Sequence, residues 1–147
     1  MATAGPLRAG GRLAALALAL ACLAVLLTAS RLRPDPRGHD THTQLGIPRC
    51  LWMARFERPC PTCGMTTSFA HMADGNTAAA FRTQPAGATA ALACAAAFWG
   101  ALHAAVRGAR WDRVLSWLVR PAVLWAVGAL FFLAWAYKLA GLDATLR

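Results

Sequence analysis

Residues 121–137 read PAVLWAVGALFFLAWAY and carry no charged side chain, while a basic residue stands directly on either side. A membrane-spanning helix needs about 20 apolar residues, because it rises ~1.5 Å per residue across a ~30 Å hydrocarbon core. The apolar pattern continues upstream, so we expect a third transmembrane helix over residues 114–138, with a kink at Pro121. Residues 139–147 are expected to form a short tail.

Two further apolar blocks precede this one. Residues 85–106 carry no formal charge and predict a second transmembrane helix, joined to the third by a basic link over residues 107–113. Residues 1–30 hold the uncharged run LAALALALACLAVLLTAS after two arginines, which favours an N-terminal anchor helix. A basic start, an apolar centre and small residues at the end are also typical of a cleaved signal peptide, so that alternative stays open.

The composition agrees with a protein of the membrane. Hydrophobic residues make up 58% of the chain and charged residues 14%, whereas soluble domains are about half apolar and about a quarter charged. The net charge of +9 comes from arginines at the ends of apolar blocks, where they meet anionic headgroups. We therefore expect a lipid bilayer as partner, together with another membrane protein or a second copy of the chain, and no nucleic acid.

Residues 31–84 form the long connection between the first two blocks. Prolines and glycines interrupt its first half and exclude a long helix there. Short interfacial helices are predicted over residues 51–56, over residues 63–73, and after Asn76, which is a good N-cap. The fold class is thus all-α: a polytopic helical membrane protein with three transmembrane helices and short interfacial helices.

The distribution of basic residues predicts an orientation. The N-terminus and the stretch 107–120 hold six Lys and Arg residues, and the long loop with the tail holds nine. The positive-inside bias acts most strongly through short, dense loops, which favours the compact 107–120 stretch. We expect a cytoplasmic N-terminus and an extracytoplasmic cysteine loop.

The main chemical signal is Cys60-Pro61-Thr62-Cys63-Gly64. Two cysteines at this spacing can bind one metal ion or close a small disulfide, while Pro61 fixes φ and Gly64 permits a left-handed turn. A structural zinc ion takes four ligands. Cys50, Cys60 and Cys63 supply three, and His71 is a candidate for the fourth, although eight residues of helix place it off the face of Cys63. One zinc ion is therefore a candidate cofactor.

Alternatives remain at this site. His39 and His42 are other candidates for the fourth ligand. Cys60 and Cys63 could instead work as a redox dithiol, with the pKa of Cys63 lowered by a helix N-terminus. They could also form a structural disulfide, with or without Cys50. A thioredoxin-like enzyme needs a βαβ context that this sequence lacks, so enzymatic activity is not expected.

The stretch from Cys50 to Gly75 resembles the small bacterial membrane proteins of domain-of-unknown-function (DUF) family 2752. The resemblance rests on a cysteine ten residues before the motif, on the motif with its following threonine, and on two turns downstream. The matching residues are Cys50, Cys60, Pro61, Cys63, Gly64, Thr66, Asp74-Gly75 and Gln84-Pro85. Members often carry an arginine where this chain has Thr67. The resemblance covers about residues 47–140 and implies a membrane protein with two or three spans after a variable start, without an established activity.

Three functions follow in order of preference. The first is a membrane scaffold or accessory protein with a structural or metal-binding cysteine knuckle. The second is a membrane thiol-disulfide redox protein that uses Cys60 and Cys63. The third, a small transporter or channel subunit, lacks the intramembrane carboxylate or broken helix that marks a transport path. The hydroxyls of Thr66, Thr67 and Ser68 are expected to serve in capping and in backbone hydrogen bonding at a helix start.

Overall fold

A computed structural model describes residues 9–56, 58–109 and 116–145, and these residues form helices and loops without a strand. Three long helices dominate: α1 (Ala9–Ala29), α5 (Pro85–Arg107) and α7 (Pro121–Thr145). Each is long and apolar enough to cross a membrane, over Ala9–Ala29, Pro85–Arg107 and Pro121–Ala140. The fold class predicted from the sequence is confirmed, and the chain is a multi-pass membrane protein by length and composition of its helices.

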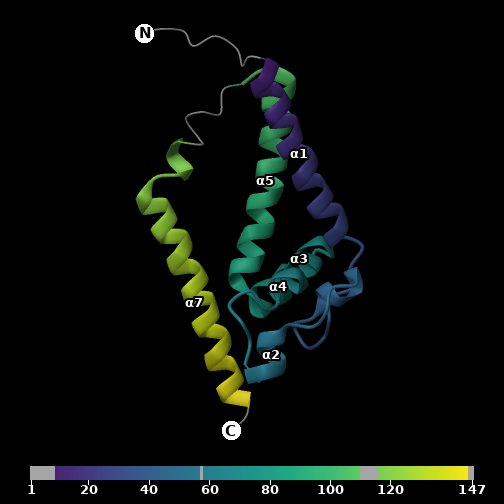
Figure 1. Ribbon diagram of the computed structural model, residues 1–147, viewed down its shortest axis with the longest axis vertical. Helices are drawn as coiled ribbons and strands as arrows, with labels where there is room; N and C mark the ends of the chain where they lie inside the picture. The colour runs from purple at the N-terminus through teal and green to yellow at the C-terminus, as the bar shows by residue number, and fades with distance from the viewer. Residues whose placement is uncertain (1–8, 57, 110–115, 146–147) are drawn as a thin grey trace.

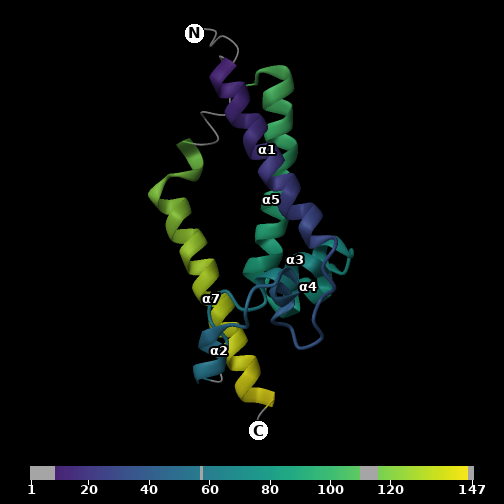
Figure 2. The same ribbon diagram turned by 45° about the vertical axis from the view of Figure 1, so that its right-hand side comes forward.

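The short helices gather at one end of the molecule (Figures 1 and 2). They lie where α1 ends, α5 begins and α7 ends, because α1 and α7 run antiparallel to α5. In chain order they are the 3₁₀ helix η1 (Thr41–Leu45), α2 (Leu51–Phe56), α3 (Met65–Ala73) and α4 (Thr77–Thr83). The long connection between the first two spans is therefore a folded cap on one end of the bundle.

Helices α1 and α5 pack closely along small residues. Ala19 and Cys22 of α1 are buried, as are Ala101 and Ala104 of α5, while the leucines of α1 mostly point outward. Small side chains let two helix backbones approach each other in a bilayer, where packing rather than the hydrophobic effect holds helices together. The Arg12 guanidinium also donates to the Val106 carbonyl at 2.8 Å, which fixes the start of α1 beside the end of α5.

The third span differs from the helix expected over residues 114–138. Helix α7 begins at Pro121 after a turn at residues 119–120, and it continues beyond Lys138 to Thr145. Proline has no N–H to give and suits the first helical position, so the chain restarts a helix there instead of bending one. Good helix formers follow Lys138, so the expected tail is helical over most of its length. Residues 110–115, with part of the basic link, lie outside the described residues.

The predicted short helices are present, with one change at a boundary. Helix α3 starts at Met65 instead of residue 63, because Gly64 takes a left-handed conformation with φ of 84° as its N-cap. Helix α2 has the predicted bounds, and Asn76 caps α4 by accepting from the Ala79 N–H at 3.1 Å. The two turns of Cys60-Pro61-Thr62-Cys63 thus stand outside α3 as a separate element.

Candidate metal centre

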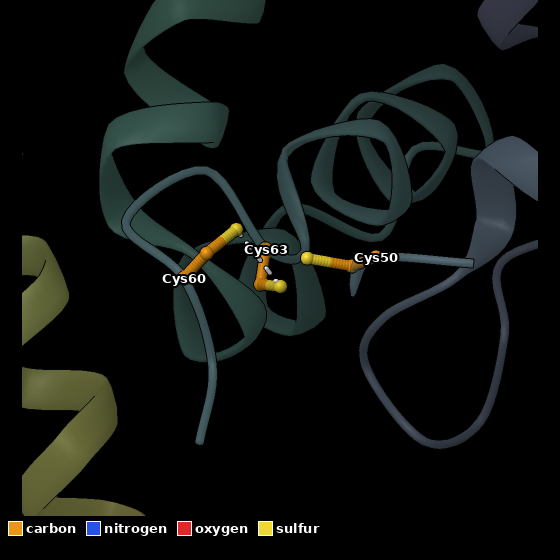
Figure 3. Close-up of side chains that lie close together, drawn as sticks. All are labelled: Cys50, Cys60 and Cys63. Atoms are coloured by element: carbon orange, nitrogen blue, oxygen red, sulfur yellow. Dashed lines mark hydrogen bonds between the residues drawn. The ribbon is translucent and has the colours of Figure 1, made fainter. Parts of the chain in front are cut away.

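Three cysteine sulfurs meet at the capped end of the bundle (Figure 3). The Sγ atoms of Cys50, Cys60 and Cys63 all lie within 4.8 Å of one another. Cys50 immediately precedes α2, and its carbonyl accepts from the Ala54 N–H at 3.1 Å in the first turn of that helix. The structure therefore joins a cysteine from one segment to the Cys60–Cys63 pair of another, as the metal hypothesis requires.

The Cys60–Gly64 segment folds as two successive turns. The Cys63 N–H donates to the Cys60 carbonyl at 3.0 Å, and the Met65 N–H donates to the Thr62 carbonyl at 3.1 Å. A Cβ atom on Gly64 would lie 2.7 Å from the Gly38 carbonyl oxygen and 2.5 Å from Lys138 Nζ. Both the positive φ and the close contacts demand glycine here, which explains the predicted structural role of this position.

The two thiols of the motif differ strongly. Burial raises the pKa of Cys63 to about 12, helped by its hydrogen bond with Cys60 at 3.1 Å. Burial also works to raise the pKa of Cys60, but hydrogen bonds from Thr62, Cys63 and Cys50 outweigh it and bring that pKa to about 7. The Thr62 hydroxyl lies 3.3 Å from the Cys60 sulfur. The expectation of a lowered pKa at Cys63 is wrong, because its burial dominates over any helix N-terminus.

A cavity of about 420 Å³ opens in front of the three sulfurs. All three cysteines line it, together with Asp40 and His42 from the segment around η1. Thr66 lines the same space from the first turn of α3. The sulfur cluster is thus partly buried in the fold and partly open to a space much larger than a water molecule.

None of the histidines proposed as the fourth ligand lies in the group formed by the three sulfurs. His71, in the last turn of α3, does not belong to the group of sulfur atoms that could share one ion. His39 Nδ1 lies 3.0 Å from the Asp40 carboxylate, and His42 Nε2 lies 3.2 Å from the Pro48 carbonyl oxygen. Of the four proposed ligands, the structure brings the three cysteines together.

The hydroxyl groups after the motif do not cap their own helix. The N-cap of α3 is Gly64, without a side-chain hydrogen bond. Instead, Thr67 shares a buried hydrogen bond of 2.8 Å with Thr41, and Ser68 donates to the carbonyls of Ala80 and Gln84 at 2.8 and 3.1 Å. The expected backbone hydrogen bonding is present at Ser68, but its partners are carbonyls of neighbouring segments. The expected capping of the helix start is wrong for both residues, because packing turns their side chains toward those segments.

Helix α7 contacts the cysteine knuckle, which we define as Cys60–Gly64, and the residues beside it. It does so through two side chains that were not predicted as site residues. The Trp135 indole donates to the Pro59 carbonyl at 3.0 Å, and the Lys138 ammonium donates to the carbonyls of Cys63 at 2.7 Å and Gly38 at 3.4 Å. Lys138 is the only lysine beside 14 arginines. A compact ammonium group can fit between two carbonyls where a planar guanidinium would not. The presence of a lysine at position 138, in a chain whose other basic residues are arginines, was therefore the sequence signal for this contact.

Replacing Lys138 by Met is expected to loosen the cap from α7. Two carbonyls would lose a charged donor in a half-buried place, at a cost of about 1.5–3 kcal/mol. For a chain of this size, the unfolding midpoint should then fall by roughly 4–8 °C. The unfolding midpoint is measured by tryptophan fluorescence while the protein is heated in detergent micelles. Arg120→Met, exposed at the other end of α7, is the control. Equal shifts in both variants would show that Lys138 has no special contact.

Comparison with models of protein families gives one match: the model described as "Protein of unknown function (DUF2752)" matches residues 50–99. No curated protein and no solved structure matches the chain. The matched range starts at Cys50, includes the knuckle and the helices α3 and α4, and ends within α5. All three clustered cysteines and the connection from the cap into the second span therefore lie inside it.

Proposed function

Since residues 50–99 of this chain match the DUF2752 family model, we propose that this region is a metal-binding module held at a membrane by three spans. Cys50, Cys60 and Cys63 bind one zinc ion as thiolates. The bound ion ties the start of α2 to the knuckle, and so to the ends of all three spans. In this proposal the chain is a scaffold or accessory protein, and its metal site organises the surface that it presents.

The main support for this proposal is that three cysteine sulfurs from two segments of the chain all lie within 4.8 Å of one another. In a tetrahedral zinc site with Zn–S bonds of about 2.3 Å, neighbouring sulfurs lie about 3.8 Å apart. Small side-chain rotations therefore suffice to bring this cluster to zinc geometry. Thiolates are soft ligands that select zinc or monovalent copper over magnesium and calcium. A ligating thiol must lose its proton, which the lowered pKa of Cys60 favours. Burial raises the pKa of Cys63, so in this proposal Cys63 loses its proton only when the ion binds.

The proposed setting is the inner membrane of a bacterium, with a cytoplasmic N-terminus and the cysteine cap outside. The cap and the end of α7 lie at one end of the bundle, and the end of α5 and the start of α7 lie toward the other (Figure 1). The dense arginines in the sequence between these two helix ends favour the cytoplasm. The exposed apolar face of α7, with Trp125 80% and Phe132 63% exposed, offers contact for lipid, another membrane protein or a second copy.

Zinc content tests the proposal. The full chain, purified in detergent with a reductant that does not bind metal, is expected to hold about one zinc per chain. A strong chelator should remove the zinc from the purified protein. In intact cells, the same chelator should allow a membrane-impermeant reagent to alkylate Cys60 and Cys63 from the extracytoplasmic side. A purified chain without metal that also fails to take up added zinc would contradict the proposal.

A second candidate, thiol-disulfide exchange, is favoured by the asymmetry of the Cys60–Cys63 pair. One pKa lies at about 7 and the other at about 12. A pair with one reactive thiolate and one buried protonated thiol suits attack by Cys60 on a disulfide, followed by resolution through Cys63. Cys50 has no necessary part in this reaction, so its removal separates the two candidates.

Replacing Thr62 by Val is expected to raise the pKa of Cys60 toward the ordinary value of about 8.5. A hydroxyl that donates to a thiolate stabilises the charged form, so its loss favours the thiol. In the metal-free reduced protein, the pH midpoint of Cys60 alkylation should lie near 7 and move upward in the variant. Mass spectrometry of the Cys60 peptide reports it. Thr66→Val is the matched control, and equal midpoints in all three proteins would contradict the assignment.

A further inference from the structure

The cavity beside the sulfurs is larger than a structural metal site requires. A structural zinc site is closed by four protein ligands, whereas a site that binds an outside ligand keeps one position free. Here about 420 Å³ of space touches all three cysteines. Liquid water takes about 30 Å³ per molecule, so the space admits a group of several heavy atoms.

Within the described residues, the sulfur group gains no fourth member from a histidine, aspartate or glutamate. The two candidates on the cavity wall are both engaged elsewhere. His42 contacts the Pro48 carbonyl, and the Asp40 carboxylate faces His39 at 3.0 Å and Arg37 at 4.0 Å. A tetrahedral ion bound by the three thiolates would thus have one position left for a ligand that comes from outside this group.

The charges around the cavity select the kind of ligand. A divalent ion with three thiolates carries a net charge of −1, and the buried Asp40 carboxylate adds a second negative charge to the wall. The nearby cations Arg37 and Lys138 are held by Asp35 and by backbone carbonyls, and neither lines the cavity. An incoming anion would therefore be repelled by two negative charges, while a neutral nitrogen donor would meet no such penalty.

The loop that carries this wall is also strained. Asp40 has a positive φ of 66° and is 6% exposed, and it is the single non-glycine residue with positive φ among the described residues. Such a conformation costs of order 1–3 kcal/mol and is retained where the surroundings hold it, frequently at ligand sites. The contacts that hold this conformation also keep Asp40 at the wall of the cavity that the three cysteines line.

From these contacts we propose that the three-cysteine site keeps its fourth metal position for an incoming neutral nitrogen donor of the imidazole class. The inference rests on the proposed metal-binding function. The donor enters through the cavity and binds the ion through one ring nitrogen, and no bond within the protein breaks. The module would then recognise its partner by coordination, and the three spans would hold that event at the membrane surface.

Cobalt substitution tests this inference apart from the proposed function. The full chain is loaded with Co²⁺ under anaerobic conditions, and the thiolate-to-cobalt charge-transfer band reports whether the cysteines bind the ion. Imidazole is then titrated while the d–d bands in the visible range are followed. We expect a saturable shift of those bands with the charge-transfer band retained, the same response in His42→Ala, and no response to azide at equal concentration.

Each other outcome has a definite meaning. A spectrum that ignores imidazole in both proteins overturns the inference. A response that appears only in His42→Ala also overturns it, because His42 would then close the site from within. A saturable response to azide instead of imidazole overturns the choice of a neutral donor. Absence of the charge-transfer band in every protein would refute metal binding by the cysteines, and with it the function on which the inference rests.

Discussion

The Cys50→Ser variant is expected to bind zinc at least about 100-fold more weakly than the unchanged protein. Zinc binds structural sites with about 10–16 kcal/mol, so losing one of three thiolates should remove several kcal/mol, and each 1.4 kcal/mol is a factor of ten. Cys50 is the informative cysteine, because it lies outside the Cys60–Cys63 pair and reaches the sulfurs only through the fold. Competition with a chromophoric chelator measures the affinity.

The matched control for this variant is Cys94→Ser. Cys94 lies in α5, where its thiol points to the Cys22 carbonyl at 3.8 Å, away from the cap. Its replacement should leave zinc affinity within about two-fold. Unchanged zinc affinity in reduced Cys50→Ser would contradict the three-cysteine metal site. A Cys60–Cys63 disulfide that forms fully in air in both variants, without zinc uptake, would favour thiol-disulfide exchange.

Replacing Gly64 by Ala is expected to destabilise the cap by about 3–4 kcal/mol. A left-handed conformation costs an L-residue about 1–2 kcal/mol, and the new methyl group would displace the Lys138 ammonium from the Cys63 carbonyl. The unfolding midpoint should fall by about 8–11 °C. Zinc affinity should fall with it, because Cys63 precedes the altered residue. Thermal scans and chelator competition on the same sample measure both.

The variant Gly46→Ala serves as the control that separates the cost of the left-handed backbone from the cost of the contacts around Gly64. Gly46 has nearly the same φ, 76°, but a Cβ there meets nothing within 4 Å. This control should cost only about 1–2 kcal/mol and leave zinc binding unchanged. Equal losses in the two variants would mean that the contact between Gly64, Lys138 and Gly38 does not hold the knuckle in place.

The sequence was sufficient for the fold where one physical signal dominates. Uncharged runs of about 20 residues predict the spans, and Asn76 marks a helix start through side-chain chemistry that acts locally. At Pro121, the sequence alone did not decide whether one helix bends or a new helix begins. That choice depends on how the preceding turn packs, which a local pattern does not contain.

The site was only half predictable for a similar reason. The spacing of Cys60 and Cys63 fixes their proximity within one turn, and Cys50 was suggested by its position ten residues earlier. The contacts of Lys138 and the buried bond between Thr41 and Thr67 join residues far apart in the chain. The pKa difference between the two motif cysteines arises from burial and neighbouring hydrogen bonds, so it also depends on the tertiary fold.

X-ray absorption at the zinc edge, recorded on the zinc-loaded full chain in detergent, tests the central claim most directly. The account predicts three sulfur neighbours at about 2.3 Å and one nitrogen or oxygen neighbour at about 2.0–2.1 Å. The sulfur number should fall to two in Cys50→Ser and remain three in Cys94→Ser. A shell that contains only nitrogen and oxygen, or a sulfur number that does not change in Cys50→Ser, would contradict the three-cysteine metal site.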